Sequence, residues 1–82
     1  MNADEVHRIV HSMILEIFEL EEGELPPDPD TNLALFGDSL QMLELMSAVE
    51  NRFDFEMPPA SFSNSKISER ALIEMVLSYG QQ

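Results

Sequence analysis

The apolar residues near the start of the chain repeat with helical spacing. Each lies three or four positions from another, and together they define one continuous face, which consists of Val6, Ile9, Val10, Met13, Ile14, Ile17 and Phe18. This period predicts an amphipathic helix. Asn2 followed by Glu5 has the spacing of a capping box, so Asn2 is expected to cap the first turn. We expect the helix to end near Glu21–Gly23, where glycine supplies a left-handed stop.

Two further helices are predicted by the same pattern. The second begins at Asp38 or Ser39, with Asp38 as its cap, and its core stripe consists of Met42, Leu45, Met46, Val49 and Phe53. Leu40 and Leu43 lie beside this stripe, so they either widen the buried face or form an exposed docking patch. The last helix runs from about Ser68 to Tyr79 and stops at Gly80; its apolar residues are Ala71, Leu72, Met75, Val76 and Tyr79.

The connections between these helices differ in length. Residues 24–37 contain Pro26, Pro27 and Pro29, which exclude a regular helix or a central strand. Three apolar residues in this loop, Leu33, Leu35 and Phe36, are expected to pin it onto the core. Residues 60–66 are expected to hold one short helical turn around Phe62, and no segment keeps the alternation of a strand. The predicted fold is an all-α four-helix bundle in one domain, residues 1–82, with three longer helices, one short helix and a long first loop.

The charge balance restricts the possible partners. Sixteen acidic residues face four basic ones, and residues 16–56 carry 12 acidic side chains and a single basic one, Arg52. Nucleic acid and anionic membrane surfaces are therefore excluded as partners, because binding a polyanion requires clustered Lys and Arg. Partners with basic patches are expected instead. The alternative is that the acidity only maintains solubility.

The composition excludes further classes of site. The chain has no cysteine, so disulfides, zinc thiolate sites and catalysis by a protein thiol are excluded. Its apolar runs are short, such as Met13, Ile14 and Leu15, and none exceeds four residues, so no segment is expected to span a membrane. The N-terminus lacks the basic and apolar stretches of a secretory signal, which favours a cytoplasmic location.

Two patterns suggest metal binding, but neither is complete. His7 and His11 stand one helical turn apart and could present two imidazoles to a metal ion. They lack an intervening Glu and an obvious third ligand, so no metal site is predicted. Asp28, Asp30 and Asn32 resemble the start of an EF-hand loop. Leu33 replaces the required glycine and Ser39 the bidentate glutamate, which excludes calcium binding of that type.

The segment Phe36–Leu40 supports two interpretations. Gly37-Asp38-Ser39-Leu40 matches the nucleophile block of GDSL-type esterases. Such a serine needs a histidine base and a carboxylate that orients it, and those enzymes carry the histidine near the C-terminus. Here both histidines lie upstream on a helix, no parallel sheet is predicted, and the chain is too short for that fold. A hydrolase is therefore disfavoured.

The second interpretation includes more of the chain. Asp38-Ser39-Leu40, Glu44-Leu45, Ala48-Val49-Glu50, Phe53-Asp54 and Met57-Pro58 together resemble the acyl carrier protein family. The resemblance covers residues 33–58 closely and residues 3–79 loosely. It implies a carrier without catalytic activity, with 4′-phosphopantetheine attached covalently to Ser39. It also implies a phosphopantetheinyl transferase, an acyl- or aminoacyl-loading ligase or transferase, and downstream synthases with basic docking patches as partners of a monomer. The expected docking residues are Asp38, Leu40, Leu43, Glu44 and Glu50.

Ser39 is suited to this role by its own surroundings. At a helix start, an attached phosphodiester meets free N–H groups and the positive end of the helix dipole. The hydroxyl has no base of its own, so another enzyme must activate it. The absence of cysteine is also accounted for, because the reactive thiol would belong to the prosthetic group.

Three positions depart from the family pattern. Gly37 directly precedes Asp38 where the family usually has one residue between them, Gln41 replaces an acid, and Arg52 replaces a glutamate. These departures resemble the stand-alone carriers of polyketide, nonribosomal peptide, aminoacyl or D-alanyl pathways at least as much as those of fatty-acid biosynthesis. The alternative function from another class is a small acidic protein-interaction module without a prosthetic group.

Overall fold

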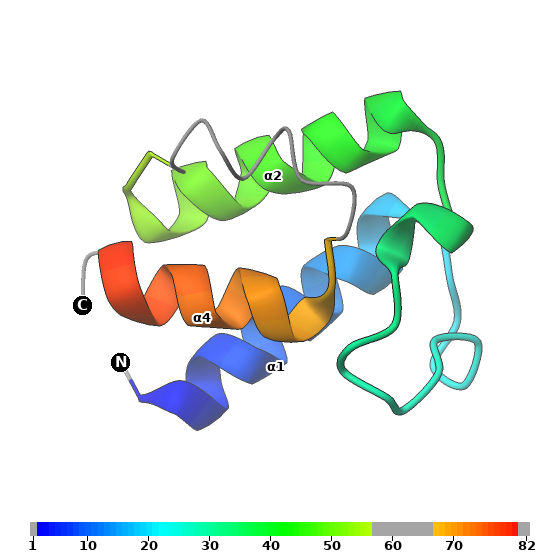
Figure 1. Cartoon of the computed structure of the whole chain (residues 1–82), viewed down its shortest axis with the longest axis horizontal. Coiled ribbons are helices and arrows are strands. Elements are labelled where there is room, and N and C mark those ends of the chain that lie inside the picture. The colour runs from blue at the N-terminus through cyan, green and yellow to red at the C-terminus, as the bar shows by residue number, and fades with distance from the viewer. Residues whose placement is uncertain (1, 57–66, 81–82) are drawn as a thin grey trace.

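The computed structural model describes residues 2–56 and 67–80, and within these residues every regular element is a helix and there is no strand (Figure 1). It comprises the α-helices α1 (Ala3–Ile17), α2 (Ser39–Phe53) and α4 (Glu69–Tyr79) and the 3₁₀ helix η1 (Leu33–Leu35). The all-α prediction is confirmed. The expected short turn around Phe62 lies outside the described residues, so a fourth α-helix is not confirmed. Among the described helices, none combines the length and the apolar character that crossing a membrane requires.

Each α-helix begins with a side-chain cap. The caps and the backbone N–H groups that donate to them are Asn2 with Glu5, Asp38 with Gln41, and Ser68 with Ala71. These short polar side chains satisfy amides that have no partner within the helix, and so they fix where each helix starts. The predicted caps Asn2 and Asp38 are confirmed, and α4 starts one residue after Ser68.

Helix α1 ends earlier than the sequence predicts. Its last residue is Ile17 rather than one near Glu21–Gly23, because Glu19 already adopts a left-handed conformation with φ 55°. The Leu20 N–H then donates to the Leu15 carbonyl at 2.8 Å, which closes the helix with a Schellman-type bond. Gly23 has φ 128°, but it lies in the loop beyond the helix end.

The core lies where the three α-helices meet. Its buried apolar residues are Val6, Val10, Ile14, Phe18, Leu33, Leu45, Met46, Val49, Phe53, Ile67, Leu72 and Val76, with Met42 and Phe36 packed against them. The predicted stripe of α2 is therefore confirmed. Tyr79 was expected on the apolar face of α4, but it is largely exposed at the end of that helix.

The long first loop is attached to the start of α4. The Leu33 N–H donates to the Ile67 carbonyl at 2.8 Å, and the Arg70 N–H donates to the Pro29 carbonyl at 3.0 Å. Leu33 is buried as predicted, whereas Leu35 is 74% exposed, which corrects the expectation that it would pin the loop. Positions two apart cannot share a face of a 3₁₀ helix with three residues per turn, so Leu33 points inward and Leu35 outward. The end of α1 and the starts of α2 and α4 lie at the same end of the molecule as this loop (Figure 1).

Candidate functional site

Ser39 is an exposed residue at the start of a firmly capped helix. It is the first residue of α2, and Asp38 before it is the cap. The Asp38 carboxylate accepts from the Gln41 N–H at 2.8 Å, and the Gln41 side-chain oxygen accepts from the Asp38 N–H at 3.0 Å. This reciprocal capping box holds the backbone on both sides of Ser39 in one conformation.

The loop before Ser39 packs tightly on the end of α1. A Cβ at Gly37 would lie 2.7 Å from the side-chain oxygen of Gln41 and 2.8 Å from the ring of Phe18, so a larger residue would displace these side chains and disturb the capping box. Gln41 also donates from Nε2 to the carbonyl of Ile17, the last residue of α1, at 3.4 Å. An acid at position 41 could accept from Asp38 but could not donate to Ile17. Sequence reasoning identified Gly37 and Gln41 only as departures from a pattern and missed this packing.

The start of α2 suits an attached phosphodiester. The amides of Ser39 and Leu40 precede the first hydrogen bond within the helix, from Met42 to Asp38, and so have no partner in the helix. The positive end of the helix dipole favours an anion at this point, and the first turn after the cap contains no acidic side chain. The exposure of Ser39 leaves its hydroxyl accessible to another protein. The residues present therefore fit 4′-phosphopantetheine on Ser39.

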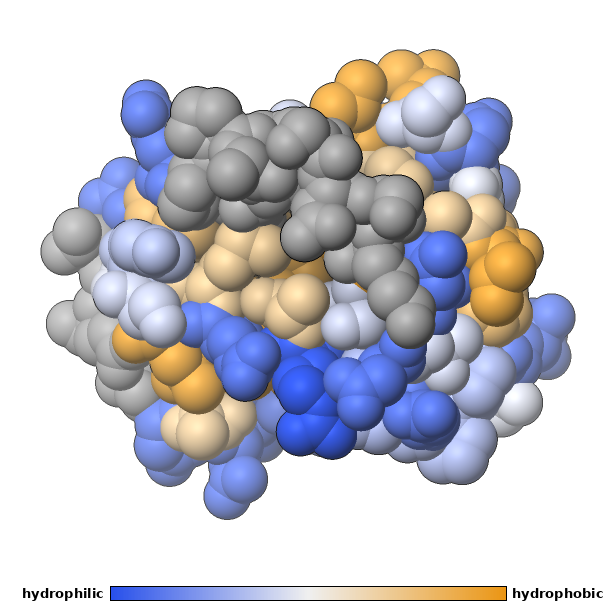
Figure 2. Space-filling view, viewed as in Figure 1, coloured by the Kyte–Doolittle hydropathy of each residue, from blue (hydrophilic) through white to orange (hydrophobic). Residues whose placement is uncertain are grey.

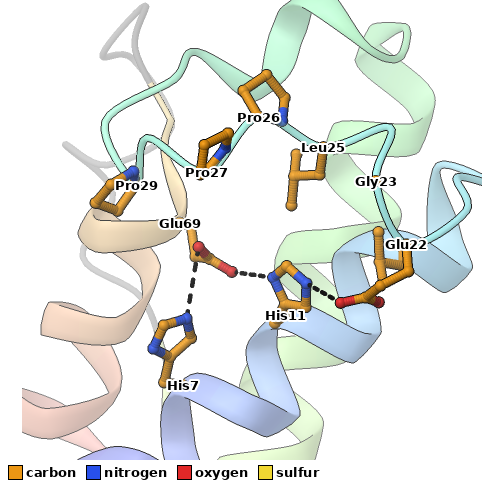
Figure 3. A pocket seen from close by; sticks show the side chains of 10 residues that line it. His7, His11, Glu22, Gly23, Leu25, Pro26, Pro27, Pro29 and Glu69 are labelled. Atoms are coloured by element: carbon orange, nitrogen blue, oxygen red, sulfur yellow. Dashed lines mark hydrogen bonds and ion pairs between the residues drawn. The ribbon is translucent and has the colours of Figure 1, made fainter.

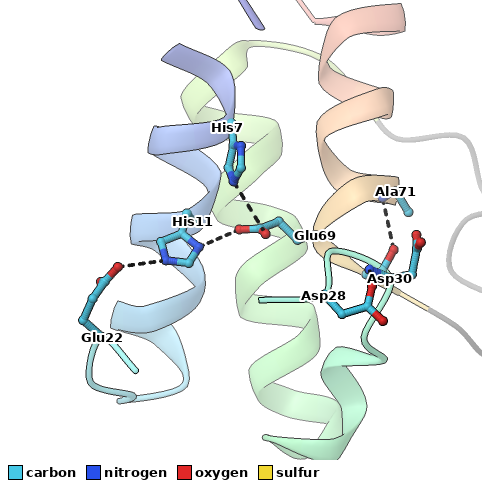
Figure 4. Close-up of polar contacts among 8 residues, drawn as sticks. His7, His11, Glu22, Asp28, Asp30, Glu69 and Ala71 are labelled. Carbon is cyan, nitrogen blue, oxygen red and sulfur yellow. Dashed lines mark hydrogen bonds and ion pairs between the residues drawn. The ribbon is translucent and has the colours of Figure 1, made fainter. Parts of the chain in front are cut away.

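Ser39 is not part of a catalytic triad. The chain has only two histidines, His7 and His11, and both contact Glu69 between α1 and α4 (Figure 4). Ser39 thus has no histidine base, and the described part of the chain contains no sheet of the kind that carries the esterase nucleophile.

Four of the predicted docking residues, Asp38, Leu40, Leu43 and Glu44, lie at the cap and in the first two turns of α2 near Ser39, whereas Glu50 lies near the other end of the helix. Leu40 is 64% exposed and Leu43 54% exposed, so they form a surface patch and do not widen the core. Asp38 and Glu44 are exposed as well, and Glu50 is half-buried. Figure 2 shows hydrophobic surface with hydrophilic residues beside it at the end of the molecule where α2 begins. Large exposed apolar side chains with a polar rim are typical of a protein-docking surface.

A second polar cluster lies between α1 and α4. His11 Nδ1 is 2.7 Å from one carboxylate oxygen of Glu69, and His7 Nε2 is 3.7 Å from the other. His11 Nε2 is 3.3 Å from the carboxylate of Glu22. Burial lowers the pKa of His11, but the hydrogen bonds and negative charges of Glu69 and Glu22 outweigh this effect and raise it above 6.5. The sequence did not associate Glu69 with the histidines, because it is 58 positions from His11 along the chain.

Comparisons with known proteins identify the family of this chain. The family model for the phosphopantetheine attachment site matches residues 8–73. An acyl carrier protein from Prochlorococcus marinus (strain MIT 9515) is 36% identical over 58 residues, which cover 71% of this chain and 72% of that protein. No solved structure matches the chain. The matched region includes the whole of α2, and with it the serine at its start. The chain therefore belongs to the acyl carrier protein family, whose members are carriers rather than enzymes and hold their cargo on covalently attached 4′-phosphopantetheine.

Proposed function

We propose that Ser39 is the residue of this chain that carries 4′-phosphopantetheine. The observation that carries the proposal is an exposed serine at the first position of a capped helix inside the matched region. When bound, the group supplies a flexible arm with a terminal thiol, which holds an acyl or aminoacyl cargo as a thioester. The capping box between Asp38 and Gln41 keeps the attachment point rigid, and the start of the helix stabilises the phosphodiester charge.

The exposed part of α2 is the proposed docking surface for the enzymes that act on the carrier. Leu40 and Leu43 are apolar anchors, and the acidic residues beside them are Asp38, Glu44 and Glu50. A partner needs an apolar pocket for the anchors and a basic rim for the carboxylates. We infer three kinds of partner: a phosphopantetheinyl transferase that removes the Ser39 hydroxyl proton, a ligase or transferase that loads the thiol, and downstream synthases.

The pathway is proposed from the departures of the sequence from the family pattern. Gly37 and Gln41 both take part in the packing of the loop on α1, so they belong to the architecture of this carrier. They support a stand-alone carrier of a specialised pathway (polyketide, nonribosomal peptide, aminoacyl or D-alanyl), with fatty-acid biosynthesis as the alternative. We infer that it acts as a monomer in the cytoplasm, where coenzyme A is available to the transferase.

The proposal is tested by incubation with coenzyme A and a broad-range transferase. Intact mass, measured before and after, is expected to show one phosphopantetheinyl group on the wild-type protein and none on Ser39→Ala. Circular dichroism checks that Ser39→Ala stays folded, since the substitution removes no cap and no buried contact. Ser47→Ala is the matched control, because Ser47 is an exposed serine on the same helix; it is expected to accept the group.

Two results would contradict this function. Addition to Ser39→Ala would place the group on another residue. A wild-type protein that neither carries nor accepts the group would instead favour an acidic protein-interaction module that binds basic partners without modification.

A further inference from the structure

Three potential metal ligands join α1 to the start of α4, outside the proposed carrier site. They are His7 and His11, one turn apart on α1, and Glu69, the first residue of α4 (Figure 3). One ligand atom from each of the three residues lies within 4.8 Å of the others. From the sequence alone, His7 and His11 had no third ligand. In the folded protein, the carboxylate of Glu69 lies next to them and can act as the third ligand.

Glu69 is a buried anion that faces both imidazoles. Its side chain is only 10% exposed, and a carboxylate buried to this extent requires partners for its charge. Among the described residues, those partners are the ring nitrogens of His11 at 2.7 Å and His7 at 3.7 Å.

His11 is oriented as a metal ligand usually is. Its Nδ1 points toward Glu69, and its Nε2 lies 3.3 Å from the carboxylate of Glu22 (Figure 4). The 2.7 Å hydrogen bond between Nδ1 and Glu69 holds a proton, which a metal ion would replace. In the tautomer that binds the ion, Nε2–H donates to Glu22 and the lone pair of Nδ1 is directed at the metal. Histidines that bind metals almost always donate their other N–H group to such an acceptor, which fixes the ring and increases its basicity.

The three ligand atoms lie within 4.8 Å of one another, so they would have to move closer together to surround one tetrahedral ion. Ligands bound at about 2.0–2.1 Å to a tetrahedral ion lie roughly 3.4 Å from one another. His7 Nε2 lies 3.7 Å from Glu69 Oε1, which is near this value, whereas His11 Nδ1 contacts the other oxygen, Oε2. A single ion would therefore be held by both oxygens or by one oxygen after a small rotation of the carboxylate. The 2.7 Å between His11 Nδ1 and Glu69 is the length of a hydrogen bond and would widen by roughly 0.7 Å as the bond is replaced by coordination. The side chains border a cavity of about 450 Å³ that is also lined by Pro26, Pro27 and Pro29, so a water molecule has room to act as fourth ligand.

We propose that His7, His11 and Glu69 bind one divalent transition-metal ion of the zinc type, with Glu22 as the outer partner of His11. Imidazole nitrogens select such ions over calcium and magnesium, which prefer oxygen ligands. The net charge of −12 attracts cations of every kind, but it does not distinguish between them. A bound ion fastens α1 to α4 and, through Glu22, to the loop, so it stabilises the folded protein.

The test is calorimetric titration of the chelator-treated protein with Zn²⁺, with excess Ca²⁺ present throughout. One Zn²⁺ is expected to bind, and the melting temperature is expected to rise with it. Glu22→Gln keeps all three ligands and should weaken binding roughly 10–100-fold. His7→Gln should weaken it more than Glu22→Gln does, and its fold should be unaffected because the His7 side chain is 57% exposed. Glu16→Gln removes an exposed charge from α1 without a ligand role and should bind Zn²⁺ as the wild type does.

Three outcomes would overturn the proposal. If His7→Gln binds Zn²⁺ like the wild type, or if excess Ca²⁺ prevents binding, the acidic surface holds the ion and this cluster does not. If the ¹⁵N chemical shifts of His11 show coordination through Nε2, the arrangement with Glu22 as outer partner is wrong. Ser39→Ala should bind Zn²⁺ normally, so the result is independent of the carrier function.

Discussion

At the residue scale, two leucines of α2 separate the core from the docking surface. Leu45 is fully buried in the core, whereas Leu40, next to Ser39, is 64% exposed. Leu45→Ala should lower the free energy of unfolding by about 2–5 kcal/mol, because it leaves a cavity in a small core. Leu40→Ala should cost much less stability but slow the modification of Ser39, because the transferase loses an apolar anchor. Thermal melts and a time course of loading measure both effects.

These two variants also test whether Leu40 belongs to the docking surface or to the core. If Leu40→Ala is as destabilising as Leu45→Ala, then Leu40 belongs to the core and the docking surface is placed wrongly. If Leu40→Ala melts and loads at the wild-type values, then Leu40 is an ordinary surface residue.

The contacts that sequence reasoning found at this scale are local. Asp38 caps α2 through an amide three positions away, and a spacing of three is visible in the sequence. Gln41 reaches the carbonyl of Ile17, 24 positions away, and Glu69 reaches His11 across 58. Contacts of this kind depend on how the helices pack, which no spacing along the chain reveals. For the same reason, the position of Ser39 at the start of α2 could be predicted from the sequence, whereas the contact of Glu69 with the two histidines could not.

At the scale of the elements, the left-handed residue that ends α1 can be tested by substitution. Glu19 adopts φ 55°, a left-handed conformation that costs a residue with a Cβ about 1–2 kcal/mol. Glu19→Gly removes this strain and should raise stability by about 0.5–1 kcal/mol after the entropy of the more flexible unfolded chain is subtracted. Glu16→Gly is the matched control, because Glu16 lies in the last turn of the helix, where glycine costs up to about 0.5–1 kcal/mol. Thermal or urea unfolding of the two variants should therefore shift in opposite directions.

These two variants, Glu19→Gly and Glu16→Gly, also test whether α1 ends at Ile17, as observed, or near Glu21–Gly23, as the sequence predicts. A helix that continued to Glu21–Gly23 would place both glutamates in its interior, and both substitutions would then destabilise the protein. The period of the apolar residues predicted all three α-helices but not this end, because glycine favours the left-handed conformation without being the only residue that adopts it. Helix η1 was missed because three residues are too few to show a period.

At the scale of the whole molecule, the negative charge opposes folding. Twelve acidic residues lie between positions 16 and 56, which span the end of α1, the long loop and α2, and only Arg52 offsets them there. Packing these segments together brings like charges closer than they are in the unfolded chain. Some charges have favourable partners, such as Arg70 with Asp30 at 2.8 Å, but both side chains of that pair are more than half exposed, and exposed pairs contribute little. Repulsion should therefore outweigh attraction.

We accordingly expect the melting temperature to rise as salt is added to the chelator-treated protein. At about 0.1 M the screening length is roughly 10 Å, which is short enough to weaken repulsion between the loop and α2. Glu44→Gln, which removes one exposed charge from α2, should raise the melting temperature at low salt, and this gain should disappear as salt is added. Magnesium should act as salt does and more strongly per ion, because its double charge neutralises carboxylates at lower concentration. A melting temperature that falls with salt would show that specific ion pairs, including those of His11 with Glu69 and Glu22, stabilise the bundle more than its net charge destabilises it.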